Sequence, residues 1–255
     1  MTQTSSNAIE FRDVECRLPS GRVLLAQLNL AIKTGETLML LGRSGSGKTT
    51  CLKMINRLIE ASAGEISVQG KPLTRWNLIQ LRRSIGYAIQ DVGLFPHYNV
   101  RQNVSLVPKL EKWPQPRIDA RVEQVLAHVG LPIGDFAGRY PNELSGGQRQ
   151  RVGLARALAA EPPILLMDEP FGALDPITRA ELQQQFRQLQ HKLGKTVVFV
   201  THDVSEALLL GDRIALMQDG RLHGVYEKRE FLHSPDPTIQ AYMDLFRAGQ
   251  ALLRD

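Results

Sequence analysis

Eight consecutive residues have the composition of a phosphate-binding loop. They read Gly42-Arg43-Ser44-Gly45-Ser46-Gly47-Lys48-Thr49, which matches the pattern G-x-x-x-x-G-K-[ST]. Glycines in such a loop let backbone N–H groups turn inward at a helix N-terminus and surround an anion. The Lys48 ammonium then reaches the β- and γ-phosphates of a nucleotide, and the Thr49 hydroxyl ligates Mg²⁺. The alternative, a plain glycine-rich turn, is disfavoured because a buried strand precedes the loop and a helix follows from Thr50.

A pair of carboxylates follows a second apolar run. Residues 164–167 read as a buried strand, and Asp168 and Glu169 come at its carboxyl end, where open α/β sheets bind ligands. Asp168 is suited to a direct or water-mediated contact with Mg²⁺, and Glu169 to polarising an attacking water as a general base. Two solvated acids at a strand end are the alternative. The phosphate-loop motif earlier in the chain weakens that alternative.

A second anion-ready helix start lies between these two motifs. The string is Leu144-Ser145-Gly146-Gly147-Gln148. Ser145 and Gln148 form a capping-box pattern, and the two glycines let an anion approach the free N–H groups of the helix start. In isolation the pattern is only a helix start. The phosphate loop already provides one triphosphate site in each chain. We therefore expect this second helix start to face the triphosphate that is bound by another copy.

The surrounding residues predict a mixed α/β fold. Strands alternate with helices, which indicates a mostly parallel sheet flanked by helices, with an antiparallel β part at the N-terminus. We expect a single domain over 1–255 whose α/β core comprises 1–95 and 161–230. Residues 96–160 have helical periodicity and prolines, and they predict an inserted helical subdomain in which Pro108, Pro114 and Pro116 lie in a loop. Residues 231–255 predict a packing helix in a tail.

Composition excludes several other classes of protein. The 255 residues are 43% apolar and 22% charged, which excludes a disordered or fibrous chain. A net charge of +5 without a long basic block gives no support for a nucleic-acid partner. Cys16 and Cys51 show neither disulfide nor metal spacing, which indicates a reducing compartment. The polar first residues contain no apolar signal segment, and no apolar run approaches membrane-spanning length. We therefore expect any membrane association to come through a partner.

Together, the three motifs resemble those of the ATP-binding-cassette (ABC) ATPases that drive membrane transporters. The resemblance covers nearly the whole chain. It implies a head-to-tail homodimer in which two ATP molecules, with Mg²⁺, lie between the phosphate loop of one copy and the Leu144–Gln148 signature of the other. It further implies that Gln90 contacts Mg²⁺, that Ala173-Leu174-Asp175 contacts the dimer partner, and that His202 contacts the γ-phosphate and positions the water.

Two positions depart from the pattern of this family. Its members usually carry an aromatic residue near position 18 that stacks on adenine, whereas Leu18 offers only apolar contact with the base. Many members have glutamine where Arg149 stands. We expect Leu18 to contact the base without stacking, and we assign no role to Arg149.

Two stretches, 85–114 and 162–183, resemble the ATPase subunits of importers for osmoprotectants: glycine betaine, choline, carnitine or proline. This resemblance implies transmembrane permease subunits as partners, a solute-binding protein as an indirect partner, and a peripheral position at the cytoplasmic face of the inner or plasma membrane. The apolar patch Leu94–Tyr98 is suited to a groove for a permease helix, and ordinary packing within the subdomain is the alternative.

Two other functional readings remain open. The first is an ATP-dependent clamp that binds without hydrolysis, which the presence of Glu169 and His202 disfavours. The second is the ATPase of another ABC system, such as lipid trafficking or amino-acid import. The sequence lacks an N-K-x-D guanine motif, which disfavours a GTPase.

Overall fold

The computed structural model describes residues 7–90, 92–172 and 174–251. The chain divides into two units: unit 1 comprises Met1–Arg75 and Val198–Asp255, and unit 2 comprises Trp76–Val197. The boundary falls inside strand β8 (Thr196–Thr201), whose first two residues belong to unit 2. Each unit is described by itself.

Unit 1 contains an antiparallel sheet of strand order β2-β1-β4-β5. Its strands are β1 (Asn7–Arg17), β2 (Val23–Lys33), β4 (Ala63–Val68) and β5 (Lys71–Pro72). Buried and exposed residues alternate along most of β2, as in a sheet with one face on the core. Ile9 and Phe11 of β1 pair with Val68 and Ile66 of β4. The antiparallel β part expected at the N-terminus is therefore confirmed.

The second group of strands in unit 1 has the order β10-β9-β3-β8. Strand β3 (Thr37–Leu41) pairs in parallel with β9 (Arg213–Gln218), which pairs antiparallel with β10 (Arg221–Glu227). All five residues of β3 are buried, as expected for a parallel strand covered on both faces. The mostly parallel sheet predicted from the sequence is confirmed.

The helices of unit 1 follow its strands. They are α1 (Lys48–Ile55), the short 3-10 helix η1 (Leu73–Arg75), α8 (Val204–Leu210), α9 (Lys228–His233) and α10 (Pro237–Ala251). Helices α8 and α10 contact one another, and α8 also contacts β3. In the tail, where the sequence predicts a packing helix, the structure has the end of α9 and then α10, and residues 252–255 lie outside the described residues.

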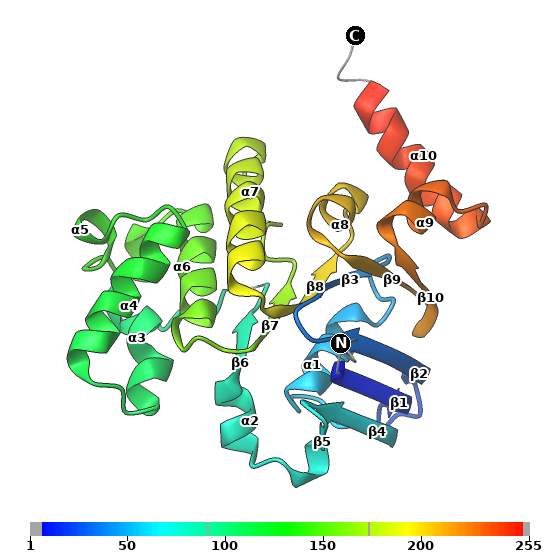
Figure 1. The fold of residues 1–255 in the computed structure, drawn as a ribbon, viewed down its shortest axis with the longest axis horizontal. Helices are drawn as coiled ribbons and strands as arrows, with labels where there is room; N and C mark the ends of the chain where they lie inside the picture. The colour runs from blue at the N-terminus through cyan, green and yellow to red at the C-terminus, as the bar shows by residue number, and fades with distance from the viewer. Residues whose placement is uncertain (1–6, 91, 173, 252–255) are drawn as a thin grey trace, which may run out of the picture. The chain divides into compact units, whose positions relative to one another are not determined.

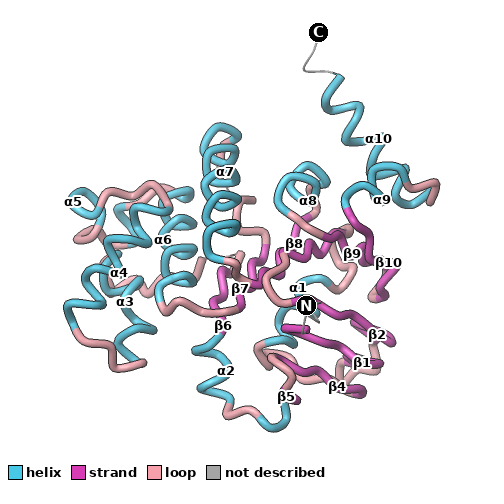
Figure 2. Tube along the Cα trace, in the orientation of Figure 1, coloured by secondary structure: helices cyan, strands magenta, loops and turns pink. Residues whose placement is uncertain are grey.

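Unit 2 contains the parallel pair β6 (Ile85–Ala88) and β7 (Ile164–Asp168), in the strand order β8-β7-β6. In the described residues between β6 and β7, every regular element is helical (Figure 2). The helices of unit 2 are α2 (Leu78–Ser84), α3 (Val100–Leu110), α4 (Gln115–His128), α5 (Ile133–Phe136), η2 (Pro141–Glu143), α6 (Gly146–Ala159) and α7 (Pro176–Leu193).

Helices α3, α4, α5 and α6 gather into one cluster (Figure 1), in which α6 contacts both α3 and α4. The residues that α4 buries include Val122, Val125 and Leu126, which are the apolar positions that predict a helix here. The residues predicted as a helical subdomain, 96–160, all lie within unit 2. That they form an inserted subdomain with these boundaries stays a prediction.

Of the three prolines that the sequence predicts in a loop, Pro114 lies in one, whereas the prediction is wrong for Pro108 and Pro116. Pro108 lies inside α3, and Pro116 lies in the first turn of α4, with Pro114 as the residue before that helix. A proline near a helix start removes an N–H group that has no partner within the helix, so Pro116 is tolerated there. Pro108 lies in the last turn of α3, where the chain is about to leave the helix, and the Trp113 N–H donates to the Pro108 carbonyl at 3.1 Å.

Both cysteines are buried, and burial raises the pKa of the Cys51 thiol to about 12. An ordinary cysteine has a pKa near 8.5, so native Cys51 should react with a maleimide at pH 8 at least about a hundredfold more slowly than a free thiol. Labelling followed by peptide mapping, in buffer and in denaturant, measures this difference. Rapid labelling of Cys51 in the native chain would contradict its burial on α1.

Candidate functional site

The phosphate loop joins β3 to α1 in unit 1. The buried strand ends at Leu41, and the loop runs from Gly42 to the first helical residue, Lys48. Gly47 has φ 98°, and a Cβ there would lie 2.6 Å from Leu25 Cδ2, so only glycine fits. Thr49 and Thr50 occupy the first turn of α1, at the positive end of the helix dipole. The strand, loop and helix predicted from the motif are all present.

Lys48 is buried beneath this loop. Its Nζ donates to the Gly42 carbonyl at 2.7 Å and to the Arg43 carbonyl at 2.8 Å. The Ser46 hydroxyl is also buried, and it has no hydrogen-bond partner among the described residues. A buried cation, an unpartnered hydroxyl and a helix N-terminus in one loop fit a phosphate group.

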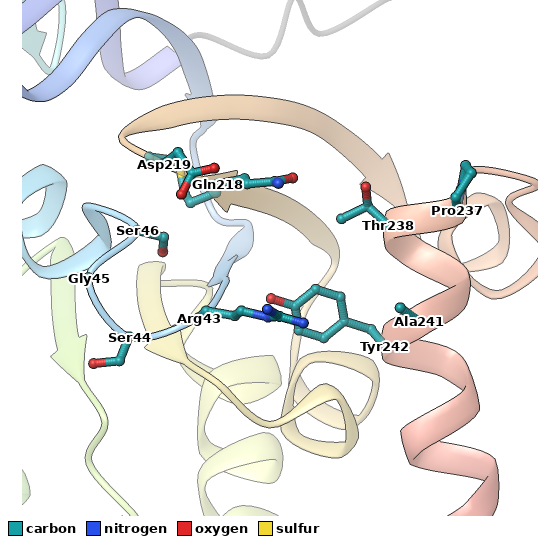
Figure 3. Close-up of a pocket in the computed structure, with 11 residues that line it drawn as sticks. Arg43, Ser44, Gly45, Ser46, Gln218, Asp219, Pro237, Thr238, Ala241 and Tyr242 are labelled. Atoms are coloured by element: carbon teal, nitrogen blue, oxygen red, sulfur yellow. The ribbon is translucent and has the colours of Figure 1, made fainter.

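A pocket of about 490 Å³ lies beside the phosphate loop in unit 1. Arg43–Ser46 form one wall, and the residues Met217–Asp219 and helix α10 form others (Figure 3). Burial raises the pKa of Tyr242 on α10, while the Arg43 charge and a hydrogen bond with the Arg43 backbone oppose that shift. Helix α10 thus reaches the phosphate loop, a contact that no local sequence pattern indicates because its two partners lie far apart in the chain.

The predicted carboxylate pair ends strand β7 in unit 2. Asp168 is buried at 3% exposure, and Glu169 is half-buried in the turn that follows. Glu169 has φ 45°, a left-handed conformation that costs roughly 1 kcal/mol for a residue other than glycine. The Gly172 N–H donates to the Glu169 carbonyl at 3.1 Å and closes the turn. Backbone strain of this kind is common where a side chain is held for function.

Tyr87 on β6 is a neighbour of this carboxylate pair that the sequence analysis missed. Its hydroxyl is buried, with no hydrogen-bond partner among the described residues. Burial raises the pKa of Tyr87, and the negative charge of Asp168 raises it further. The phenol therefore stays protonated, with the negative charge of Asp168 acting on it. Strand pairing between β6 and β7 creates this proximity, and no motif at Tyr87 signals it.

Gln90 and His202 each lie just beyond a strand end. Gln90 is exposed two residues after β6, which ends at Ala88 rather than at the predicted Ile89. His202 is exposed in unit 1 between β8 and α8. The Thr201 hydroxyl donates to Glu206 at 2.6 Å and accepts from the Asp203 N–H at 3.0 Å, which holds the turn that carries His202.

The signature string begins α6 as predicted. The Ser145 hydroxyl accepts from the Gln148 N–H at 3.2 Å, and the Gln148 side chain accepts from the Ser145 N–H at 2.9 Å. This capping box leaves Ser145 and Gly146 exposed at the helix N-terminus, while Leu144 is buried. Arg149 donates to the Leu144 carbonyl at 2.7 Å, so its side chain holds the turn before the helix.

A pocket of about 480 Å³ in unit 2 brings the signature and Asp175 together. Its lining includes Ser145–Gln148, Arg151, Asp175 and Thr178. Asp175 caps α7 by accepting from the Thr178 N–H at 3.0 Å, and the hydrogen bonds from Thr178 lower the pKa of Asp175. Two motifs that the family resemblance assigns to the dimer contact therefore share one pocket. Ala173, the first residue of the second motif, lies outside the described residues.

Leu18 lies in the turn after β1 and is 40% exposed. Its N–H donates to the Arg22 carbonyl at 2.9 Å. In total, unit 1 carries Leu18, the phosphate loop and His202, whereas unit 2 carries Gln90, Asp168, Glu169, the signature and Asp175. The roles of these residues, including the contact of Leu18 with a base, stay predictions.

No helix in residues 7–90, 92–172 and 174–251 combines the length and the apolarity needed to cross a bilayer.

The family model described as ABC transporter matches residues 25–172. The choline transport ATP-binding protein OpuBA of Bacillus subtilis (strain 168) is 52% identical over 244 residues, which cover 95% of this chain and 64% of that protein. The glycine betaine uptake system ATP-binding protein YehX of Escherichia coli (strain K12) is 50% identical over 214 residues, 84% of this chain and 69% of that protein. The chain thus spans less than two thirds of the length of the Bacillus relative.

A solved structure of similar fold is a dimeric ATP-binding cassette in a post-hydrolysis state, bound to ADP and Pi. It is 35% identical and has a TM-score of 0.80 over 87% of this chain and 99% of that chain. The fold, the family match and the identities agree with the three motifs described above. This chain belongs to the ABC transporter family.

Proposed function

We propose that this chain is the ATP-hydrolysing motor subunit of an importer for an osmoprotectant such as glycine betaine, choline, carnitine or proline. The observation that carries the proposal is the pairing of two anion sites in one chain: the phosphate loop over buried Lys48, and the capped N-terminus of α6 at Ser145. One nucleotide needs only the first, so the second serves a nucleotide of another copy. The names of the relatives support the solute class.

Thr49, Gln90 and Asp168 are the residues that would hold Mg²⁺. The buried Asp168 carboxylate at the end of β7, the hydroxyl of Thr49 and the amide oxygen of Gln90 would supply oxygen donors only, which are the donors that Mg²⁺ prefers. Bound Mg²⁺ supplies charge neutralisation on the phosphate oxygens.

Each of these residues has a separate role in the proposed hydrolysis of ATP. Lys48 and the loop N–H groups hold the β- and γ-phosphates of ATP, and the Ser145 end of α6 from a second copy contacts the γ-phosphate from the opposite side. Glu169 accepts a proton from the attacking water, and His202 orients that water on the γ-phosphate. Glu169 lies in unit 2 and the phosphate loop lies in unit 1. That the two meet at one nucleotide is therefore part of this proposal.

The partners that we propose are a second copy of the chain, permease subunits and, indirectly, a solute-binding protein. Phe95 in the patch Leu94–Tyr98 is 41% exposed, and its ring packs against those of His97 and Tyr98, which provides an aromatic surface for a permease helix. Binding there places the chain at the cytoplasmic face of the membrane. A nucleic-acid partner is not part of the proposal.

Dilution tests the shared nucleotide site. If two copies form each site, phosphate release per protomer should fall about tenfold for each tenfold dilution below the dimer dissociation constant, since dimers then form in proportion to the square of concentration. Steady-state phosphate release with saturating MgATP, measured over several decades of protein concentration, gives this slope. A rate per protomer that is independent of dilution in a monomeric sample would refute the shared site. A chain that binds ATP at every concentration but releases no phosphate would instead be a clamp.

Purification from the native membrane tests the transport role. We expect the chain to purify with a multi-span permease, and the associated binding subunit to retain a quaternary amine or proline. Retention of a sulfur oxyanion, a lipid or another amino acid would assign the chain to a different ABC system and leave the ATPase assignment intact.

A further inference from the structure

One arginine of α6 fastens the signature helix to the chain segment that follows Gln90. The Arg156 guanidinium donates to the Val92 carbonyl at 2.6 Å and to the Gly93 carbonyl at 2.7 Å. Both bonds are charge-assisted, the stronger class of hydrogen bond in proteins. Burial lowers the pKa of Arg156, so this charge is partly withdrawn from water and is held by the two carbonyls.

The fastened backbone has an unusual conformation. Val92 has φ 45° and Gly93 has φ 52°, and a β-branched residue such as Val92 rarely adopts a left-handed conformation. Such a conformation persists when its surroundings enforce it. Gly153, one turn before Arg156, contributes to this, because a Cβ there would lie 2.7 Å from Val92 Cγ1. Helix α6 thus holds Val92 by its side chain and by its carbonyl.

The far end of the same segment is held by α3. The buried Asn103 side chain accepts from the Phe95 N–H at 2.8 Å and donates to the Tyr98 carbonyl at 2.9 Å. Helices α3 and α6 also pack against each other. The segment Val92–Tyr98, here called the post-glutamine segment, is therefore attached at both ends to helices of one cluster.

We propose that Arg156 is a positioning residue that makes the post-glutamine segment and α6 move as one body, so that a displacement of this segment displaces Ser145. Arg156 lies eleven residues after Ser145, roughly 16 Å along the helix. Force applied to the exposed Phe95 ring would reach the N-terminus of α6 through the helix rather than through a loop. The inference rests on the proposed function in one respect: the Ser145 end is taken to meet a nucleotide.

A second buried arginine provides a matched control. Arg121 on α4 donates to the Leu158 carbonyl at 2.6 Å and to the Ala159 carbonyl at 3.0 Å, at the C-terminal end of α6. Burial lowers its pKa as well. Arg121 thus also attaches α6 through a pair of charge-assisted hydrogen bonds, but these bonds join α6 to α4 and not to the post-glutamine segment. A purely structural role for Arg156 would make the two arginines equivalent.

Hydrogen exchange of the full chain without nucleotide tests the attachment. In Arg156→Gln, the backbone amides of residues 92–95, 97 and 98 should exchange at least about tenfold faster than in the wild type, because two charge-assisted bonds are lost. Arg121→Gln should accelerate exchange at the end of α6 and leave residues 92–98 unchanged. Arg156→Lys should lie between, since a lysine ammonium lacks the planar fork that binds two carbonyls. Equal acceleration of residues 92–98 in the two glutamine variants would overturn the proposal.

The coupling itself is tested with MgATP. In the wild type, MgATP should slow exchange both at residues 146–149 and in the post-glutamine segment. In Arg156→Gln, slowing at residues 146–149 should remain while slowing in the segment is lost, and protection of both in this variant would refute the coupling. If the wild type shows no slowing at residues 146–149, the proposed function fails, and the nucleotide-free comparison still decides the attachment. Should Arg156→Gln not fold, Gly153→Ala, which displaces Val92 but keeps the charge, should also accelerate residues 92–98.

Discussion

Replacing Glu169 with glutamine should slow turnover strongly and preserve ATP binding. Loss of a general base lowers a rate by about 10²–10⁴-fold, so steady-state phosphate release should fall within this range. Glutamine has nearly the same shape as glutamate and fills the same space after β7. The fold and the phosphate loop should therefore remain intact. Because hydrolysis no longer reopens the nucleotide site, MgATP should accumulate a dimer of the variant.

Steady-state phosphate release measures the loss of turnover, and sedimentation with MgATP measures the accumulation of the dimer. Glu181→Gln is the matched control, because Glu181 is an exposed carboxylate on α7 and its loss should leave turnover unchanged. Unfolding curves for both variants separate a catalytic effect from instability. A Glu169→Gln chain that stays monomeric with MgATP, or that hydrolyses at the wild-type rate, would remove Glu169 from the proposed mechanism.

Replacing Lys48 with alanine should weaken ATP binding by about 10- to 100-fold, the loss expected when a charged hydrogen-bond donor is removed. The Lys48 ammonium lies within bonding distance of the Gly42 and Arg43 carbonyls, so it is already beneath the loop in which we place the phosphates. Alanine keeps the helix and removes the cation. Phosphate release should fall with the loss of occupancy.

Calorimetric titration with ATP, using a non-hydrolysable analogue where turnover interferes, measures the affinity. Lys53→Ala is the control, because Lys53 lies in the last turn of the same helix. This substitution also removes one positive charge, but it leaves the phosphate loop unchanged. An unchanged ATP affinity in a correctly folded Lys48→Ala chain would contradict the assignment of the phosphate cradle.

The elements nearest the candidate site follow closely from local sequence. Strand β3 covers the predicted residues, and β7 ends at Asp168, because continuous apolar runs are stable only where a strand is buried on both faces. The start of α6 was equally predictable, since the capping box at Ser145 and Gln148 uses partners three residues apart. Local interactions of this kind can be read from residue type and spacing alone.

Prediction failed where a contact joins distant residues. Pro108 was expected in a loop, yet packing of α3 against α6 and α4 keeps the helix intact through that position. The contact of Tyr242 with the Arg43 backbone and the bonds of Arg156 to Val92 join residues far apart in sequence. Neither pair has a spacing that a motif could reveal, because only the folded chain brings the partners together.

The sequence by itself determined the local structure of three motifs: the loop at Gly42–Thr49, the carboxylate pair and the capped glycine helix start, each built from neighbouring residues whose types dictate their local geometry. The tertiary structure decided how those pieces are held, through the strained turns at Glu169 and Val92 and the attachment of α6 by Arg156. The physical reason is the separation along the chain between the residues that interact. Caps and loops form within a few residues, whereas strained backbone and buried charge are stabilised only by partners that folding supplies from elsewhere in the chain.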